Sequence, residues 1–290
     1  MRIFWVLLLA ALAATGQAAV TVVDDAGRSV TLARPAQRVI SMAPHVTELL
    51  FAAGAGAHVV GAMNFSDYPA AARKIPLIGS NSQIDIERVV ALRPDLLVVW
   101  QSGNTARQIE QIERLGIPVF RSEPRRLDQV ADSIVRLGQL LGTDASARPA
   151  AADLRKRIAS LAARFSKRPP VTVFYQVWDR PLYTLNGSQI ASDAIALCGG
   201  RNIFAKLATI APEVSVEAVL QQDPEAIVAG PSFGPDDRGI SIWKPFPTMT
   251  AVRRGNLFTL SSDLLTRPGP RIVDGAAELC QMLEQARKQR

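Results

Sequence analysis

One short motif in the sequence has the pattern of a serine nucleophile. Residues 230–234, Gly-Pro-Ser-Phe-Gly, match the G-x-S-x-G elbow of α/β-hydrolases. That elbow must open a helix, whereas residues 235–245 form a loop interrupted by proline and glycine. The triad histidine should also follow the serine, but His45 and His58 both precede Ser232. A secreted hydrolase is therefore the most distant alternative, and we do not expect an enzyme.

Two glutamates stand at matching places in a repeated unit. IERVVALRPDLLVVW at 86–100 and VEAVLQQDPEAIVAG at 216–230 align without a gap, and each predicts a helix that leads into a strand. Asp85 and Ser215 are natural N-caps, which places Glu87 and Glu217 in the first helical turns. The helix dipole alone favours a glutamate there. Its occurrence in both units indicates instead two docking points for cationic residues of one partner.

A catalytic or structural transition-metal site is not expected. Cys198 and Cys280 are too far apart for a zinc motif, and His45 and His58 are the only histidines that could join them. Overall charge gives no indication of nucleic-acid binding. The chain has 33 basic and 26 acidic residues, and the basic residues are scattered instead of forming a continuous run.

The N-terminus has the layout of a secretory signal peptide. In residues 1–19, Arg2 precedes an unbroken apolar run that ends in the small-residue exit GQA. No later apolar stretch approaches the roughly 20 residues that span a bilayer. We therefore expect an exported, soluble chain. Because exported cysteines usually pair, Cys198 and Cys280 are predicted to form one disulfide.

Short β-branched runs alternate with amphipathic segments, which predicts an α/β fold with mostly parallel sheets. The region 127–165 differs because it is helical throughout and contains no strand candidate. We expect a signal peptide at 1–19, an N-terminal α/β lobe at 20–126, a helical connector at 127–168 and a C-terminal α/β lobe at 169–290. The expected strands are 38–43, 59–63, 95–100, 117–122, 171–178, 225–230 and 256–262, and the expected helices are 45–54, 85–92, 105–116, 127–142, 150–165, 191–200, 215–222 and 270–290.

Several segments together resemble one family. They are RVISMAPHVTELLFAAG, SDYP, IERVVALRPDLLVVW, GIPVF, PLYT, LCGGRNIFA, VSVEAVL and RPGPRI, spread over residues 38–283. The chain resembles the periplasmic cobalamin-binding proteins, which belong to the class III substrate-binding proteins. The resemblance implies two Rossmann-like lobes joined by one long rigid helix. It also implies a monomer without a cofactor that captures a corrinoid and delivers it to the permease dimer of an inner-membrane ABC importer.

The resemblance also assigns roles to individual residues. Glu87 and Glu217 fall on the family's docking glutamates, which engage arginines of the permease, and Cys198 and Cys280 match its disulfide. The positions that fall on family cleft residues are Tyr68, Trp100, Tyr183, Asp263 and Arg267. Aromatic faces and a few polar groups suit a large planar macrocycle. Arg267 has a simpler interpretation too, as a surface partner of Asp263.

At two cleft positions the sequence departs from the family. Asn81 and Ala211 stand where the cobalamin binder has tryptophans. Their smaller side chains leave room for a related corrinoid, such as cobinamide. Trp243 lies in an expected loop that could reach the cleft and compensate.

Two other ligands are compatible with the same fold. Haem needs an axial ligand, for which Tyr68 or His45 are candidates. A ferric siderophore is anionic and favours an arginine-rich cleft, for which Arg267 and Arg271 are candidates. Zinc and manganese binders of this class resemble a three-histidine site, which two histidines cannot supply.

Overall fold

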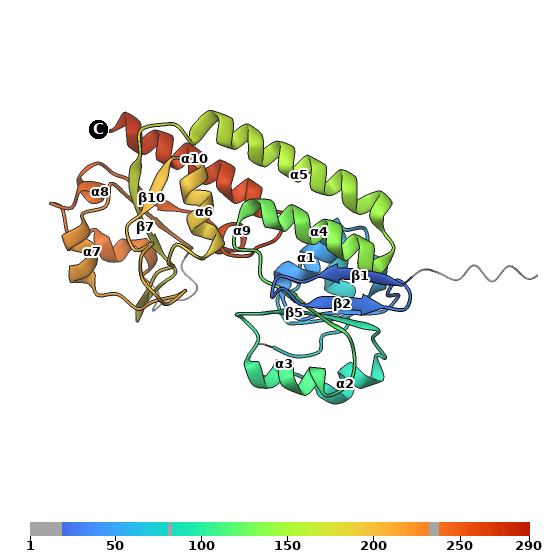
Figure 1. The fold of residues 1–290 in the computed structure, drawn as a ribbon. Coiled ribbons are helices and arrows are strands. Elements are labelled where there is room, and N and C mark those ends of the chain that lie inside the picture. Colours follow the sequence, from blue (N-terminus) through green and yellow to red (C-terminus); the bar gives the residue numbers. More distant parts are fainter. Residues whose placement is uncertain (1–18, 81–82, 232–237) are drawn as a thin grey trace, which may run out of the picture.

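The computed structural model describes residues 19–80, 83–231 and 238–290. Nearly all of the expected signal peptide, Asn81 and the serine of the G-x-S-x-G motif lie outside these ranges. The described chain forms two four-stranded parallel sheets, one in each half (Figure 1).

The N-terminal sheet has the strand order β4-β3-β5-β6. Its strands are β3 (Val39–Ser41), β4 (Val59–Ala62), β5 (Leu96–Trp100) and β6 (Val119–Ser122). The helices of this half are α1 (Pro44–Ala52), α2 (Ile86–Ala91) and α3 (Ala106–Glu113), with short 3-10 helices η1 (Gly56–His58) and η2 (Ala70–Lys74).

The C-terminal sheet has the order β10-β7-β11-β12. Its strands are β7 (Val171–Gln176), β10 (Gly200–Asn202), β11 (Ala226–Ala229) and β12 (Leu257–Thr259). Around it lie α6 (Ile190–Leu197), α7 (Val216–Gln222), η3 (Gly239–Trp243), α8 (Thr250–Arg253), α9 (Ser262–Leu265) and α10 (Ile272–Lys288).

Two small hairpins complete the fold, and the sequence did not predict either as a hairpin. β1 (Val20–Val23) pairs with β2 (Ser29–Leu32), and β8 (Trp178–Asp179) pairs with β9 (Leu182–Tyr183). The edge strand β10 was missed as well, since Gly-Arg-Asn has low β-propensity and its position comes from pairing with β7.

Helices α4 (Leu127–Leu141) and α5 (Asp144–Phe165) occupy the predicted helical connector. They are joined through Gly142, whose φ of 68° is a left-handed conformation that favours glycine. Gly138 lets the helices approach closely, because a Cβ there would lie 2.3 Å from the Cβ of Ala147. α5 has 22 residues and is therefore about 33 Å long, enough to run along both halves.

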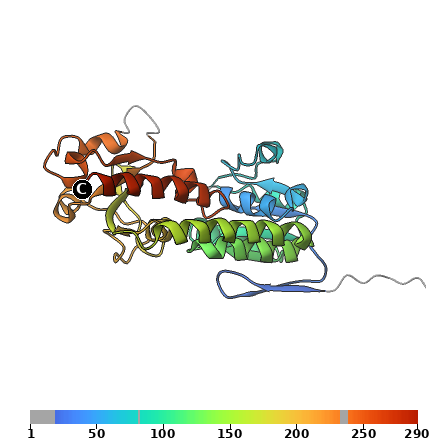
Figure 2. The same ribbon diagram turned by 90° about the horizontal axis from the view of Figure 1, so that it is seen from above.

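One apolar core continues from the first sheet to the second. In β5, Leu96 and Val98 belong to this shared core, while Leu97 and Val99 pack into a separate cluster on the other face. In β7, Val173 joins the shared core in the same way. Figure 2 shows α5 and α10 running side by side over this shared layer. The two lobes are thus held together by packed apolar side chains as well as by the chain segments that connect them.

Candidate functional site

A buried carboxylate joins the two lobes. Glu48, in α1, accepts hydrogen bonds from Nε and Nη2 of Arg271 at 3.0 and 2.6 Å. Arg271 immediately precedes α10, on the opposite lobe. The Glu48 side chain is only 2% exposed. The two hydrogen bonds from Arg271 therefore offset the cost of burying its carboxylate as an anion.

Arg267 extends this contact into a network. Its Nη2 lies 2.8 Å from Asp263, and its Nη1 lies 3.5 Å from Asp67 and 3.9 Å from Glu48. We call Glu48, Asp67, Asp263, Arg267 and Arg271 the interlobe charge cluster. The predicted pairing of Arg267 with Asp263 is present. It is not a surface pair, because the Arg267 side chain is 18% exposed and also faces two carboxylates of the other lobe.

Tyr68 lies against the same cluster. The guanidinium of Arg271 sits 4.1 Å from the centre of the Tyr68 ring, a cation–π contact. The ring remains 46% exposed. It borders a cavity of about 350 Å³, which is also lined by Phe51, Arg157 and Pro270.

His45 and Trp100 form an aromatic contact in the N-terminal lobe. Their ring centres are 5.3 Å apart in an edge-to-face arrangement. Burial, assisted by the positive charge of Arg267, lowers the pKa of His45 to about 3, so its imidazole is neutral at physiological pH. Trp100 is half-buried, and its indole lies over Gly103, where a Cβ would be 1.8 Å from the ring.

The C-terminal lobe brings Tyr183 and the segment of Ala211 together. Tyr183 forms an isolated bridge with Glu213, and the backbone N–H of Thr184 donates to the carbonyl of Pro212 at 3.1 Å. Ala211 is exposed beside this edge.

Trp243 does not reach a cleft, so it cannot supply the compensation that the sequence left open. Its side chain is fully buried, and its Nε1 donates to Oε1 of Gln176 at 2.6 Å. The ring packs edge-on against Phe174. The 3-10 helix η3 turns Trp243 into the core of the C-terminal lobe, where a large apolar side chain with one satisfied donor is stable.

The two predicted docking glutamates occupy the expected positions. Asp85 accepts a hydrogen bond from the backbone N–H of Arg88 at 2.9 Å, and Ser215 accepts one from Ala218 at 3.1 Å. Both are therefore N-caps, and Glu87 and Glu217 lie exposed in the first turns of α2 and α7. Figure 1 places these helices on different lobes.

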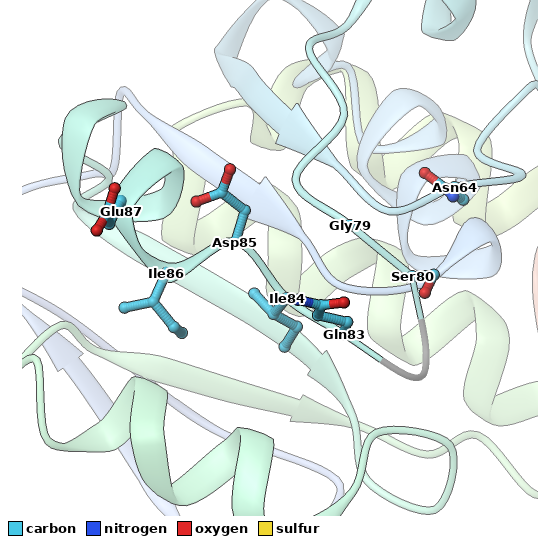
Figure 3. A pocket seen from close by; sticks show the side chains of 8 residues that line it. All are labelled: Asn64, Gly79, Ser80, Gln83, Ile84, Asp85, Ile86 and Glu87. Atoms are coloured by element: carbon cyan, nitrogen blue, oxygen red, sulfur yellow. The ribbon is translucent and has the colours of Figure 1, made fainter.

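A cavity of about 500 Å³ adjoins Glu87 (Figure 3). Figure 3 shows the Asp85 carboxylate and the Ile86 side chain projecting to opposite sides of the backbone. Gly79 allows the backbone to approach Gln83 closely at this cavity, since a Cβ there would lie 2.2 Å from the carbonyl oxygen of Gln83. The residues that line the cavity are Asn64, Gly79, Ser80, Gln83, Ile84, Asp85, Ile86 and Glu87.

The predicted disulfide is present between Cys198 and Cys280, with the sulfurs 2.01 Å apart. It ties the end of α6 to α10. Within residues 19–80, 83–231 and 238–290, no group of three or more His, Cys, Asp or Glu side chains is arranged so that it could hold a metal ion. Over the same ranges, none of the helices has the length and apolar character of a membrane span.

Comparison with known proteins identifies the family. A family model described as periplasmic binding protein matches residues 39–264. The chain belongs to this family. Periplasmic binding proteins capture substrates and are not a family of enzymes, and their ligands are cargo rather than cofactors. The predicted fold class, two α/β lobes with parallel sheets, is confirmed.

Several periplasmic binding proteins are similar over most of their length. A vitamin B12-binding protein of Vibrio parahaemolyticus is 34% identical over 263 residues, 90% of this chain and 95% of that protein. One from Yersinia pestis is 36% identical over 251 residues, covering 87% and 88%.

Solved structures of the family are similar as well. The crystal structure of the periplasmic vitamin B12-binding protein of Vibrio cholerae has a TM-score of 0.81 at 33% identity, covering 88% of this chain and 99% of that one. A periplasmic haem-binding protein of Pseudomonas aeruginosa has a TM-score of 0.72 at 27% identity, covering 84% and 91%.

Proposed function

We propose that this periplasmic binding protein captures a corrinoid between its two lobes and delivers it to an ABC importer. The observation that carries the proposal is the end-to-end similarity to vitamin B12-binding proteins, at 34% identity over 90% of the chain. Residues 1–19 would direct export, and 20–126, 127–168 and 169–290 would form the first lobe, the connector and the second lobe.

The candidate cleft residues offer suitable chemistry for such a ligand. Tyr68 and Tyr183 present partly exposed aromatic rings from opposite lobes, and Trp100 adds a half-buried ring in the first lobe. Asp263 and Arg267 supply polar groups at the junction. Asn81 and Ala211 leave space where the family resemblance places tryptophans, so we propose that cobinamide is accepted as well as cobalamin.

The structure favours limited lobe motion. A continuous apolar core, the parallel course of α5 and α10, and the interlobe charge cluster all resist wide opening. Release of the ligand then requires work from outside, and we infer that the permease supplies it by pulling on both lobes.

Glu87 and Glu217 are the proposed handles for this step. Both carboxylates are exposed, each lies in the first turn of a helix, and the two helices belong to different lobes. Arginines of a permease dimer could engage both at once, with one copy of this protein per transporter.

Haem and ferric siderophores fit the site less well. The Nε2 atom of His45 is fully buried, so it cannot reach an iron atom without rearrangement. Arg267 and Arg271 already face carboxylates, which removes the positive charge that an anionic siderophore would need. Tyr68 remains the candidate axial ligand for a haem.

Co-purification tests the proposal directly. The full chain, produced in bacteria supplied with cyanocobalamin, should be recovered from the periplasm with a corrinoid absorption spectrum and with residues 1–19 removed. Recovery of folded protein with a haem spectrum, or with no chromophore after growth in saturating cyanocobalamin, would contradict it.

A further inference from the structure

Trp178 is an exposed tryptophan in the C-terminal lobe that the family resemblance does not assign to the site. Its side chain is 41% exposed, whereas tryptophan is usually well covered. Trp178 lies in β8, directly opposite Tyr183 of β9 in the antiparallel register. Directly opposed residues of such a pair project from the same face, so Trp178 and Tyr183 form one aromatic surface.

The other face of this hairpin is turned into the protein. Asp179 and Leu182 are only 8% and 6% exposed, and Leu182 belongs to the core of the C-terminal lobe. Because side chains alternate along a strand, burial of this pair fixes the outward direction of Trp178 and Tyr183.

Both edges of the hairpin are held. On one side, Oδ2 of Asp179 accepts a hydrogen bond from the backbone N–H of Arg238 at 3.0 Å. On the other, Tyr183 bridges Glu213. The indole Nε1 donates to the carbonyl oxygen of Arg180 at 3.0 Å, which orients the ring over the turn. The aromatic surface is therefore preorganised rather than loose.

Its place in the fold is that of a ligand-binding loop. The hairpin follows β7 directly, at the carboxyl end of an interior strand of the parallel sheet. Ligands of open α/β sheets bind outside these carboxyl ends. The Ala211 segment runs along the opposite edge of β9, and Ala211 is itself exposed there with a small side chain.

We propose that Trp178, together with Tyr183, packs against the corrin macrocycle and replaces the aromatic contact that Ala211 cannot make. The inference rests on the proposed function, because it names the wall that the corrinoid contacts. Trp243, fully buried, cannot take this role.

Titration calorimetry of three variants with cyanocobalamin and with cobinamide tests this assignment. Trp178→Ala should weaken binding of both ligands by about tenfold, since both contain the corrin ring and the loss of a well-stacked aromatic ring, about 1.4 kcal/mol, corresponds to a factor of ten. Trp178→Phe should keep affinity within about threefold. Val23→Ala is the matched control, because it truncates another exposed apolar residue, 52% exposed, in the distant hairpin β1–β2.

The possible outcomes separate this inference from the proposed function. If the unmodified protein binds neither corrinoid, the proposed function and the role of Trp178 are both wrong. If it binds and Trp178→Ala binds equally well, only the role of Trp178 is wrong. A loss confined to cyanocobalamin would also overturn it, because it would place the indole against the nucleotide portion instead of the ring. An unchanged urea midpoint for Trp178→Ala would confirm that the affinity change is not a folding defect.

Discussion

Glu48 and Arg271 are 223 positions apart in the sequence, yet they form two hydrogen bonds of 2.6 and 3.0 Å across the junction of the lobes. The pair fixes the start of α10 against α1. Arg267 lies in the same cluster, so the relative position of the two lobes depends on three charges, of Glu48, Arg267 and Arg271, that are largely withdrawn from water.

Replacing Arg271 by leucine should destabilise the protein strongly. Glu48 would keep its burial but lose its main partner, which costs about 3 kcal/mol in comparable cases. The double variant Glu48→Leu/Arg271→Leu should recover most of this loss, because no unpaired charge remains. Urea unfolding measures the free energy of unfolding of the single and the double variant. Arg201→Leu, which replaces an exposed arginine on β10, is the control. Equal stability of Arg271→Leu and the unmodified protein would show that the pair contributes nothing.

His45 should make stability depend on pH. Its pKa is about 3 in the folded protein and 6.5 ordinarily. Between these values the unfolded chain binds a proton at this position and the folded chain does not. The free energy of unfolding should therefore fall as pH decreases from 6.5 toward 3, by up to about 1.4 kcal/mol per pH unit.

The variant His45→Phe should flatten this dependence while keeping an aromatic ring against Trp100. Urea midpoints measured from pH 7 to pH 4 provide the comparison. His58→Gln, which changes the other histidine of the chain, serves as the control and should retain the slope. Parallel pH profiles for His45→Phe and the unmodified protein would be incompatible with a buried neutral His45.

The disulfide should contribute several kcal/mol. It closes a loop spanning 82 residues, and the loop-entropy relation gives about 4.5 kcal/mol for this length. The variant Cys198→Ala/Cys280→Ala should unfold at a temperature lower by roughly 10 °C. Added reductant should lower the Tm of the unmodified protein but leave that of the variant unchanged. A reductant effect of the same size on both would mean that it does not act through this bond.

The docking glutamates should affect transport and not ligand binding. Glu87→Ala/Glu217→Ala should bind its corrinoid within about twofold of the unmodified protein, while uptake through the permease of the same bacterium falls at least tenfold. Glu110 and Glu278 are matched controls, exposed on α3 and α10 of the two lobes. If ligand affinity of the folded double variant collapses, the two glutamates belong to the cleft.

Much of the fold follows from local patterns in the sequence. The apolar run before Trp100 predicts a buried parallel strand, and β5 begins at Leu96, one residue after the expected start. Asp85 and Ser215 predict helix starts because their side chains can accept from the first free N–H groups. Gly116 is left-handed at φ 70°, as a C-terminal glycine should be, although α3 ends earlier, at Glu113. Short-range geometry decides each of these features.

Features that depend on distant contacts could not be predicted in this way. The sequence around Trp243 predicts a loop, whereas in the structure η3 places this residue in the core of the C-terminal lobe. Glu48 carries a visible anomaly, a glutamate within the apolar helix segment HVTELLFA, but its partner Arg271 is known only from the tertiary structure. The role proposed for Trp178 depends on its cross-strand pairing with Tyr183, which the expected single strand at 171–178 did not include.

Calorimetric titration of the mature protein with cyanocobalamin, cobinamide, haem and a ferric siderophore decides whether this chain binds a corrinoid. We expect saturable binding of a corrinoid with one ligand per protein, at an affinity at least tenfold above that for haem or the siderophore. Binding of haem or the siderophore without any corrinoid binding would contradict it.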